Sequence, residues 1–317
     1  MVIKKYNSQK KIKISLFIGL IILLCLLILL VSIKKFDSFI FSQKFFLADD
    51  RQVDVVKNEP LKVQFYDEKT FYDSLIWLKN NPKTFSDCQI VTAVVPHHLL
   101  AGFMPAGLFA KLASQKIETV FVVGPNHWEK GEKILTSNAI WETPFGNVMP
   151  NEEIISDLKE KGLMQIENYI MQKEHSTTGL FPLIAYYLPN VKIVPIILSA
   201  KNTRAEIEKL NDELSKYLEN EKNMLVVSVD FSHYLNSNEA ESKDNETLKV
   251  LQSFDYDKLF QLNNDNLDSP TSIATFLSAT QKNGKAKFEV IDHSNSANIL
   301  GGNIVKTTSY FSLAACR

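Results

Sequence analysis

Histidines in four short segments are the strongest candidates for functional residues in this sequence. Neutral imidazole is the commonest metal ligand in proteins, and a neighbouring carboxylate commonly orients the ring. Two of the segments carry an acid close to the histidine, and one carries an amide. The segments are Pro96-His97-His98, Asn126-His127, Glu174-His175-Ser176 and Asp230-Phe231-Ser232-His233. They predict a metal-type site, provided that the fold brings them together.

Three of the four segments follow short apolar runs that we expect to be β-strands. Apolar runs separated by stretches of helical composition are typical of βαβ units, and their continuous hydrophobicity indicates a sheet covered on both faces. The expected strands cover residues 89–95, 119–123, 192–198 and 224–229, and the expected helices between them cover 105–114, 179–187 and 204–220. In such sheets ligands bind beside the carboxyl ends of the strands, which is where His97, His127 and His233 fall.

The remaining segments are expected to complete one α/β domain with a mostly parallel central sheet flanked by helices. An amphipathic helix is expected over 68–80, before the first strand. Later helices are expected at 239–254 and 270–280, and later strands at 288–293 and 307–313. Pro270 suits the first turn of its helix, with Ser269 or Asp268 as the cap.

The N-terminus carries a long apolar run with basic flanks. Residues 14–33 are 20 residues without a charge, about the length that crosses a bilayer core. Five lysines precede the run and two follow it closely, which predicts a cytoplasmic N-terminus and a domain outside the cytoplasm. We therefore expect a basic tail and transmembrane anchor over 1–35, a juxtamembrane linker over 36–60 and the α/β domain over 61–317. A cleaved signal peptide and a buried core helix are the alternatives.

Charge and cysteine content exclude some functions. Beyond residue 44 the chain carries 27 basic and 35 acidic residues, a net charge of −8. A domain of that sign is not expected to bind nucleic acid through its overall charge. Cys25 lies in the apolar run, which leaves only Cys88 and Cys316, too few for a disulfide framework. A single bridge between these two stays open.

Taken in order, the histidine segments resemble the Memo-like family, also called AmmeMemoRadiSam system protein B. The resemblance covers about residues 88–315 and rests on the combination of motifs rather than on any one of them. The matching segments are Pro96-His97, Val-Gly-Pro-Asn-His at 123–127, Trp141-Glu142-Thr143-Pro144, Glu174-His175-Ser176, Val194-Pro195 and Val-Ser-Val-Asp-Phe-Ser-His at 227–233. The family is similar in fold to the class III non-haem iron extradiol dioxygenases, which have their site at one edge of an α/β sheet.

The resemblance implies a metal site that uses His97 and His127, with Asp230 and His233 close by and His175 near the pocket. This sequence departs from the family in two places. His98-Leu99-Leu100 stands where the family commonly has Ala-Gly-Tyr, so His98 is an undecided extra ligand. Residues 266–270 replace a Cys-Gly-x-x-Pro segment, and Asp268 is the residue placed to substitute for its cysteine. Two histidines and one carboxylate form a set that suits non-haem iron(II) and also zinc.

The expected function is that of a metal-dependent oxidoreductase acting on a small molecule, with iron as the expected metal and copper or zinc as alternatives. His97, His127 and Asp268 would hold the metal, and His233, oriented by Asp230, or else His175 would transfer protons. A metal-dependent hydrolase and a non-catalytic module that binds a small molecule or a peptide are the alternatives. The sequence has no Gly-x-Ser-x-Gly, Gly-x-Gly-x-x-Gly or phosphate-loop motif, so serine hydrolysis and nucleotide cofactors are not expected.

A distance between two imidazoles tests whether one site exists. Two ligands of a single metal bring their ring nitrogens to within roughly 3–4 Å of each other, given metal bonds near 2.1 Å. We therefore expect His97 and His127 to approach in this way. A separation beyond about 7 Å that no side-chain rotamer closes would end the hypothesis of a shared site.

Overall fold

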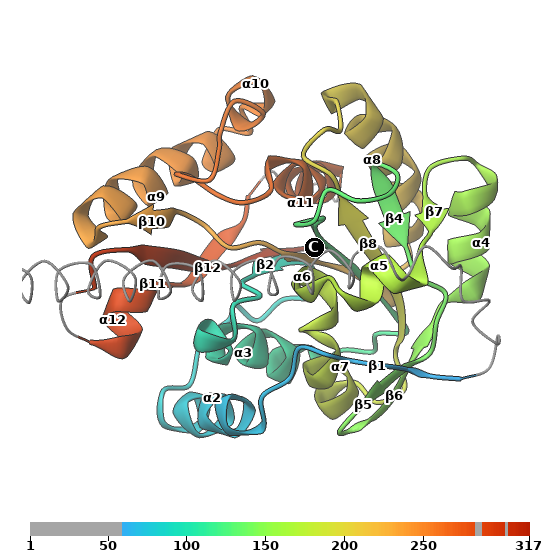
Figure 1. The fold of residues 1–317 in the computed structure, drawn as a ribbon, viewed down its shortest axis with the longest axis horizontal. Coiled ribbons are helices and arrows are strands. Elements are labelled where there is room, and N and C mark those ends of the chain that lie inside the picture. Colours follow the sequence, from blue (N-terminus) through green and yellow to red (C-terminus); the bar gives the residue numbers. More distant parts are fainter. Residues whose placement is uncertain (1–58, 283–286, 302–303) are drawn as a thin grey trace, which may run out of the picture. The chain divides into compact units, whose positions relative to one another are not determined.

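A mixed β-sheet of twelve strands runs through the residues that the structure describes, which are 59–282, 287–301 and 304–317 (Figure 1). The structure is a computed structural model, and the described residues belong to one compact unit of the chain. Five neighbouring strands in the middle of the sheet are parallel. In spatial order they are β6 (Gly146–Pro150), β8 (Lys192–Leu198), β3 (Thr119–Pro125), β9 (Asn223–Ser228) and β2 (Ile90–Val95).

The two sides of the sheet depart from this parallel arrangement. Beside β2 lies β12 (Thr307–Cys316), which is antiparallel to β2 and also pairs antiparallel with β10 (His233–Leu235) and β11 (Glu289–Asn295). On the other side, antiparallel pairs join β5 (Trp141–Thr143) to β6 and β4 (Ile134–Thr136) to β8. Two-residue strands then pair in parallel with these, β1 (Leu61–Lys62) with β5 and β7 (Gln165–Ile166) with β4. The expected mostly parallel sheet is therefore corrected to a mixed sheet with a parallel centre.

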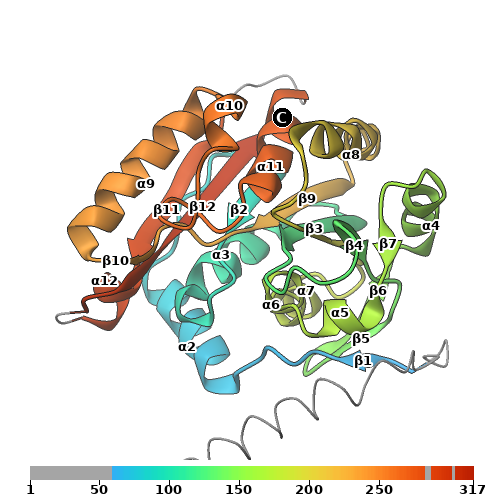
Figure 2. The ribbon, with the colours of Figure 1, turned by 45° about the horizontal axis from the view of Figure 1, so that its top comes forward.

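Helices cover both faces of the sheet (Figures 1 and 2). One face carries α2 (Glu68–Asn80), α3 (Phe103–Leu112) and α7 (Phe181–Tyr187), and the other carries α8 (Arg204–Leu218), α9 (Ser237–Gln252) and α11 (Pro270–Lys282). Shorter helices connect these elements. They are η1 (Leu99–Ala101), α4 (Glu152–Glu160), α5 (Asn168–Gln172), α6 (His175–Thr178), α10 (Tyr256–Leu259) and α12 (Ser296–Leu300).

Two separate hydrophobic cores lie between the sheet and its helices, because successive side chains of a strand point to opposite faces. In β2, Val94 packs into the core with α8 and α11, whereas Ala93 and Val95 pack into the core with α3 and α7. All six residues of β2 are buried, as are all seven of β3. This confirms the expectation, drawn from continuous hydrophobicity, that the central strands are covered on both faces.

The structure does not bear out the prediction of a transmembrane helix. The apolar run 14–33 and most of the expected linker lie outside the described residues, and in the part of the chain that is described no helix is both long and apolar enough to cross a membrane. The structure therefore does not support a single-pass membrane protein, its contact with the membrane, or the placement of the domain outside the cytoplasm. The fold class is therefore an α/β fold with a mixed sheet, without the transmembrane helix that was part of the prediction.

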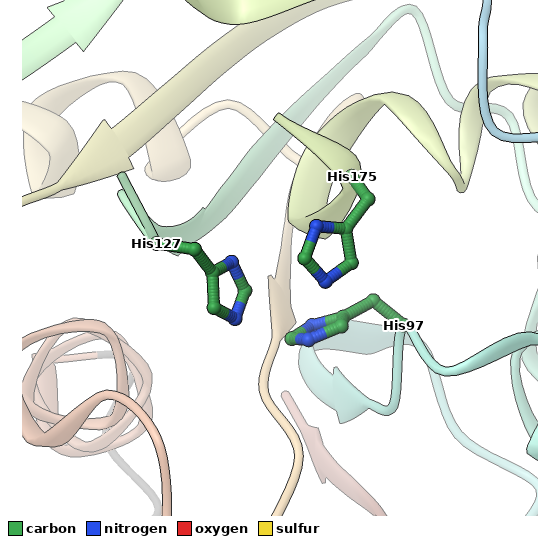
Figure 3. Close-up of side chains that lie close together, drawn as sticks. All are labelled: His97, His127 and His175. Carbon is green, nitrogen blue, oxygen red and sulfur yellow. The ribbon is translucent and has the colours of Figure 1, made fainter. Parts of the chain in front are cut away.

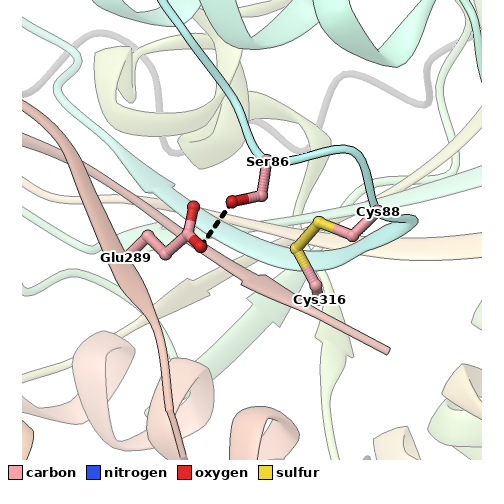
Figure 4. Close-up of a disulfide and its surroundings, with 4 residues drawn as sticks. All are labelled: Ser86, Cys88, Glu289 and Cys316. Atoms are coloured by element: carbon pink, nitrogen blue, oxygen red, sulfur yellow. Dashed lines mark hydrogen bonds between the residues drawn. A yellow bond between two sulfur atoms is a disulfide. The ribbon is translucent and has the colours of Figure 1, made fainter.

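A disulfide joins Cys88 to Cys316 (Figure 4). Cys88 lies just before β2 and Cys316 is the last residue of β12, so the bridge links the adjoining ends of two neighbouring strands. The two Cα atoms are 5.8 Å apart, a usual separation for a disulfide. Close by, the Ser86 hydroxyl donates a hydrogen bond to the Glu289 carboxylate of β11. The bridge that the sequence left open is therefore formed.

Candidate metal centre

Three imidazoles from three different segments meet at the carboxyl ends of the parallel strands (Figure 3). His97 follows the end of β2 by two residues, His127 follows the end of β3 by two, and His175 begins α6. Their ring centroids are 5.0 Å apart for His97 and His127, 5.0 Å for His97 and His175, and 4.3 Å for His127 and His175. Each offers a nitrogen within 4.8 Å of the others, inside the limit for a shared site.

Two aspartates complete the cluster around His97. Asp268 Oδ2 lies 3.4 Å from His97 Nε2 and 3.7 Å from His127 Nε2. Asp230 Oδ2 lies 3.6 Å from His97 Nε2. The two aspartates hold each other, since the Asp268 amide donates to the Asp230 carbonyl at 3.1 Å and the Asp230 amide donates to Asp268 Oδ2 at 3.2 Å. His97, Asp230 and Asp268 thereby form a second group of possible ligands.

The start of α11 explains why Asp268 is free to reach the cluster. Either Ser269 or Asp268 could cap this helix by its position in the sequence, and the structure shows that Ser269 does so. Its hydroxyl accepts the Ser272 amide at 3.2 Å. The Asp268 carboxylate therefore points away from the helix. Its Oδ1 atom is buried without a hydrogen-bond partner, as expected of a group that faces a ligand site.

Glu174 orients His127, a role that the sequence did not reveal. Its carboxylate is fully buried and accepts the amide of His127 at 2.9 Å and the amide of Ser176, the N-cap bond of α6, also at 2.9 Å. Its Oε1 lies 2.8 Å from His127 Nδ1. Nδ1 then donates its proton to Glu174 and Nε2 faces the cluster, which is the orientation of a metal-bound histidine. The sequence signal for this role was the Glu174-His175 pair, but such a pair is equally compatible with an exposed turn.

Burial and charge give the three imidazoles different proton affinities. Complete burial lowers the pKa of His97 to about 3, against the attraction of Asp268. Burial likewise lowers the pKa of His175, helped by the charge of His127. For His127 burial acts in the same direction, but the hydrogen bonds to Asp268 and Glu174 outweigh it and raise the pKa to about 10. In the metal-free protein His97 and His175 are therefore neutral near pH 7, whereas His127 is protonated and interacts with two carboxylates.

Burial and the neighbouring histidines also shift the pKa values of two carboxyl groups, Asp230 and Glu174. Burial raises the pKa of Asp230, although the charges of His98 and His233 oppose the change. Burial would raise the pKa of Glu174 too, but the hydrogen bond from His127 and its charge are stronger and lower it. Glu174 is therefore ionised at neutral pH, whereas Asp230 is the carboxyl of the cluster best suited to hold a proton.

His98 and His233 lie beside the cluster rather than within either ligand group. His98 Nδ1 is hydrogen bonded to the Tyr310 hydroxyl at 2.9 Å, and the two rings are nearly parallel. His233 begins β10, and its Nδ1 is buried without a hydrogen-bond partner. It is close enough to Asp230 for its charge to act on that carboxyl. The structure thus brings together five of the six predicted site residues and places His233 at their border.

The centre is closed on one side and open on the other. The His97 side chain is 2% exposed, while those of His127 and His175 are 28% and 36% exposed. Neutral imidazoles and ionised carboxylates are ligands of divalent transition metals, so this buried group could hold a metal ion that solvent or a small molecule reaches from the His127 side. The chain is therefore an α/β protein with a candidate metal centre at the carboxyl ends of its parallel strands.

Comparison with known proteins identifies the family. A sequence model of the Memo-like protein family matches residues 64–313, so the chain belongs to the Memo-like family, as the motifs predicted. The MEMO1 family protein of Thermoplasma volcanium is 30% identical over 243 residues, which are 73% of this chain and 87% of that protein. The MEMO1 family protein of Methanosarcina barkeri is 28% identical over 223 residues, 67% of this chain and 82% of that protein.

A solved structure is similar at a greater distance. An uncharacterized protein of Escherichia coli K12 aligns over 71% of this chain and 99% of its own, with a TM-score of 0.49 and 14% sequence identity. A similarity of this degree says nothing about function, and no role is taken from it.

Proposed function

We propose that this Memo-like protein is a non-haem metal-dependent oxidoreductase that acts on a small molecule, with His97, His127 and Asp268 holding a divalent metal, iron first among the candidates. The observation that supports this most directly is the approach of Asp268 Oδ2 to the Nε2 atoms of both histidines, at 3.4 and 3.7 Å. Two imidazoles and one carboxylate on one side of a metal are the ligand set of non-haem iron(II) oxygenases, in which further positions stay open for substrate.

The residues around these three have distinct parts in the proposal. Glu174 keeps His127 in the tautomer that presents Nε2 to the metal. His175, neutral at pH 7 because burial lowers its pKa, offers either a further ligand or a base that accepts a proton from the substrate. Asp230 and His233, adjacent to the ligands, form a second proton-holding pair, with the unpartnered Nδ1 of His233 available for exchange. Bound iron would supply the Lewis acidity and the redox chemistry.

Metal analysis of the purified full chain tests the ligand set. After anaerobic loading with iron(II), copper(II) or zinc(II) and removal of excess ion, we expect about one metal per chain, because the two groups of possible ligands share His97. His97→Ala and His127→Ala should each abolish stoichiometric binding. His98→Ala is the matched control, since its ring packs against Tyr310 instead of the cluster, and it should keep the metal. Absence of bound metal in the unaltered protein under all three conditions would refute the proposal.

Metal identity then separates oxidation from hydrolysis. An oxidoreductase should take up iron or copper and consume O₂ in the presence of a reducing small molecule. Tightly held zinc without O₂ consumption would point instead to a centre that activates water for hydrolysis. His175→Ala distinguishes the two roles proposed for that residue. Loss of metal in the variant would indicate that His175 is a ligand, whereas retained metal with lost turnover would indicate that it accepts a proton.

A further inference from the structure

A small apolar pocket lies beside the histidine centre, between α2, η1 and the start of α7. Its volume is about 40 Å³. Six apolar or aromatic side chains form most of its wall, and they are Phe65, Tyr66, Phe71, Leu99, Pro182 and Leu183. Leu99 lines the pocket and is 38% exposed.

The pocket shares its walls with the segments that carry the histidines. Leu99 comes two residues after His97, and Gly179 directly follows the short helix α6 that begins at His175. The ring of Phe65 contacts that of His175, with centroids 5.5 Å apart. A molecule bound at the open side of the centre, where His175 is partly exposed, therefore lies next to Phe65 and the pocket behind it.

The polar groups that line the pocket are already engaged inside α2. The Asp67 carboxylate caps the helix and accepts the Thr70 amide at 2.7 Å. The Ser74 hydroxyl donates to the Thr70 carbonyl at 2.8 Å. Because these groups are satisfied by the helix, a polar ligand would gain little from them, whereas an apolar group would be removed from water against aromatic and aliphatic walls.

We propose that this pocket binds a short apolar chain of the substrate, while an oxygen-bearing head group of the same molecule lies at the histidine centre. The substrate class is therefore a small amphipathic molecule. A water-sized group needs about 10–15 Å³, so the pocket accommodates roughly three heavy atoms of the apolar chain. This inference rests on the proposed function, because the head group is placed by the metal.

A series of alkyl hydroxamates tests the inference on the full chain loaded with cobalt(II). Acetohydroxamate, butyrohydroxamate, hexanohydroxamate and octanohydroxamate share one metal-binding head and differ only in chain length. Binding is followed in the visible spectrum of the cobalt. We expect affinity to rise by up to about fourfold per methylene over the part of the chain that enters the pocket, and then to level off when the pocket is full.

Two matched variants show where the chain binds. Leu99→Ala removes part of the pocket wall and should flatten the rise in affinity with chain length. Leu100→Ala makes the same change one residue later, at a side chain that does not line the pocket, and should keep the rise. Equal rises in both variants, or a flat series in the unaltered protein, would overturn the inference. If cobalt does not bind at all, the proposed function fails and the inference with it; if cobalt binds normally, only the inference is at stake.

Discussion

Glu174 shows how one buried carboxylate sets the behaviour of the candidate centre. It accepts two backbone amides and faces His127 Nδ1 at 2.8 Å, with no exposed surface of its own. In Glu174→Gln the amide nitrogen has to face one of these donors, and the charge that holds the His127 proton is lost. We expect metal affinity to fall by 10- to 100-fold, the usual effect of removing such an orienting group. Competition with a chelator of known affinity measures the change.

Glu152→Gln is the control for this substitution. Glu152 is exposed in the first turn of α4, away from the histidines, so the same chemical change there should leave metal affinity within twofold. Equal affinities for Glu174→Gln and the unaltered protein would show that Glu174 only caps α6.

The high pKa of His127 makes metal binding dependent on pH. Its pKa is raised to about 10, so a metal that takes Nε2 must displace a proton at neutral pH. Affinity should therefore rise by up to tenfold per pH unit between pH 7 and 9 and level off near pH 10. His97, with a pKa near 3, adds no further proton in this range. Calorimetry in buffers of different ionisation heat counts the protons, and release of none would contradict the assignment.

The raised pKa of His127 also determines how the stability of the metal-free protein changes with pH. The folded pKa of His127 lies above the usual 6.5, so its contribution to stability is fully present below pH 6.5 and is lost as the pH rises through 10. His97 acts in the opposite sense. Its folded pKa lies below 6.5, so stability falls as the pH drops from 6.5 towards 3. Urea midpoints of the metal-free protein should therefore decline on both sides of neutrality.

The sequence alone predicted only some of the residues of the candidate site. His97 and His127 could be assigned as ligands because each follows a strand whose carboxyl end was expected at one sheet edge. Asp268 was suggested only by the missing cysteine, and its approach to both rings depends on the hydrogen bonds that its amide and its carboxylate make to the Asp230 backbone. Glu174 was missed because its burial is a property of the folded chain, while the sequence shows only an acid before a histidine.

At the level of elements, the start of α11 links helix capping to the centre. Ser269 accepts the Ser272 amide and begins the helix, which leaves the Asp268 carboxylate for the histidines. Ser269→Ala should lower the free energy of unfolding by about 1 kcal/mol, the usual effect of losing a cap. It should also weaken metal binding, because Asp268 is then free to turn and cap the helix itself. Denaturant unfolding and chelator competition measure the two effects.

Ser278→Ala in the middle of the same helix is the matched control. Its side chain is only half-buried and it lies two turns from the centre, so stability should change by less than about 0.5 kcal/mol and metal affinity not at all. A Ser269→Ala protein as stable as this control would show that the cap contributes nothing measurable.

Long elements could be predicted from the sequence and short ones could not. The helix expected over 68–80 has those bounds in the structure, and the strand expected over 192–198 also does. The strands β1, β4, β5 and β7 have only two or three residues, too few to show any periodicity. The direction of β12 was also missed, because an apolar run looks the same whether it pairs in parallel or antiparallel. This strand is one of several with antiparallel pairing that make the sheet mixed.

At the scale of the whole molecule, the disulfide joins two neighbouring strands of the sheet, β2 and β12, that lie far apart in the sequence. Cys88 and Cys316 are 228 residues apart, so the bridge closes a loop that contains nearly every described element. A cross-link of this length restricts the unfolded chain far more than the folded one. Removing such a bridge typically lowers the free energy of unfolding by about 2–5 kcal/mol.

The double variant Cys88→Ser, Cys316→Ser should therefore unfold at a clearly lower urea concentration. Its metal affinity should stay unchanged, because β2 is also held by its parallel pairing with β9, and His97 follows the opposite end of β2 from the bridge. Unaltered protein treated with reductant should behave like the double variant. Identical urea midpoints for the oxidised protein and the variant would show that the bridge adds no stability, and a loss of metal in the variant would show that it positions the centre.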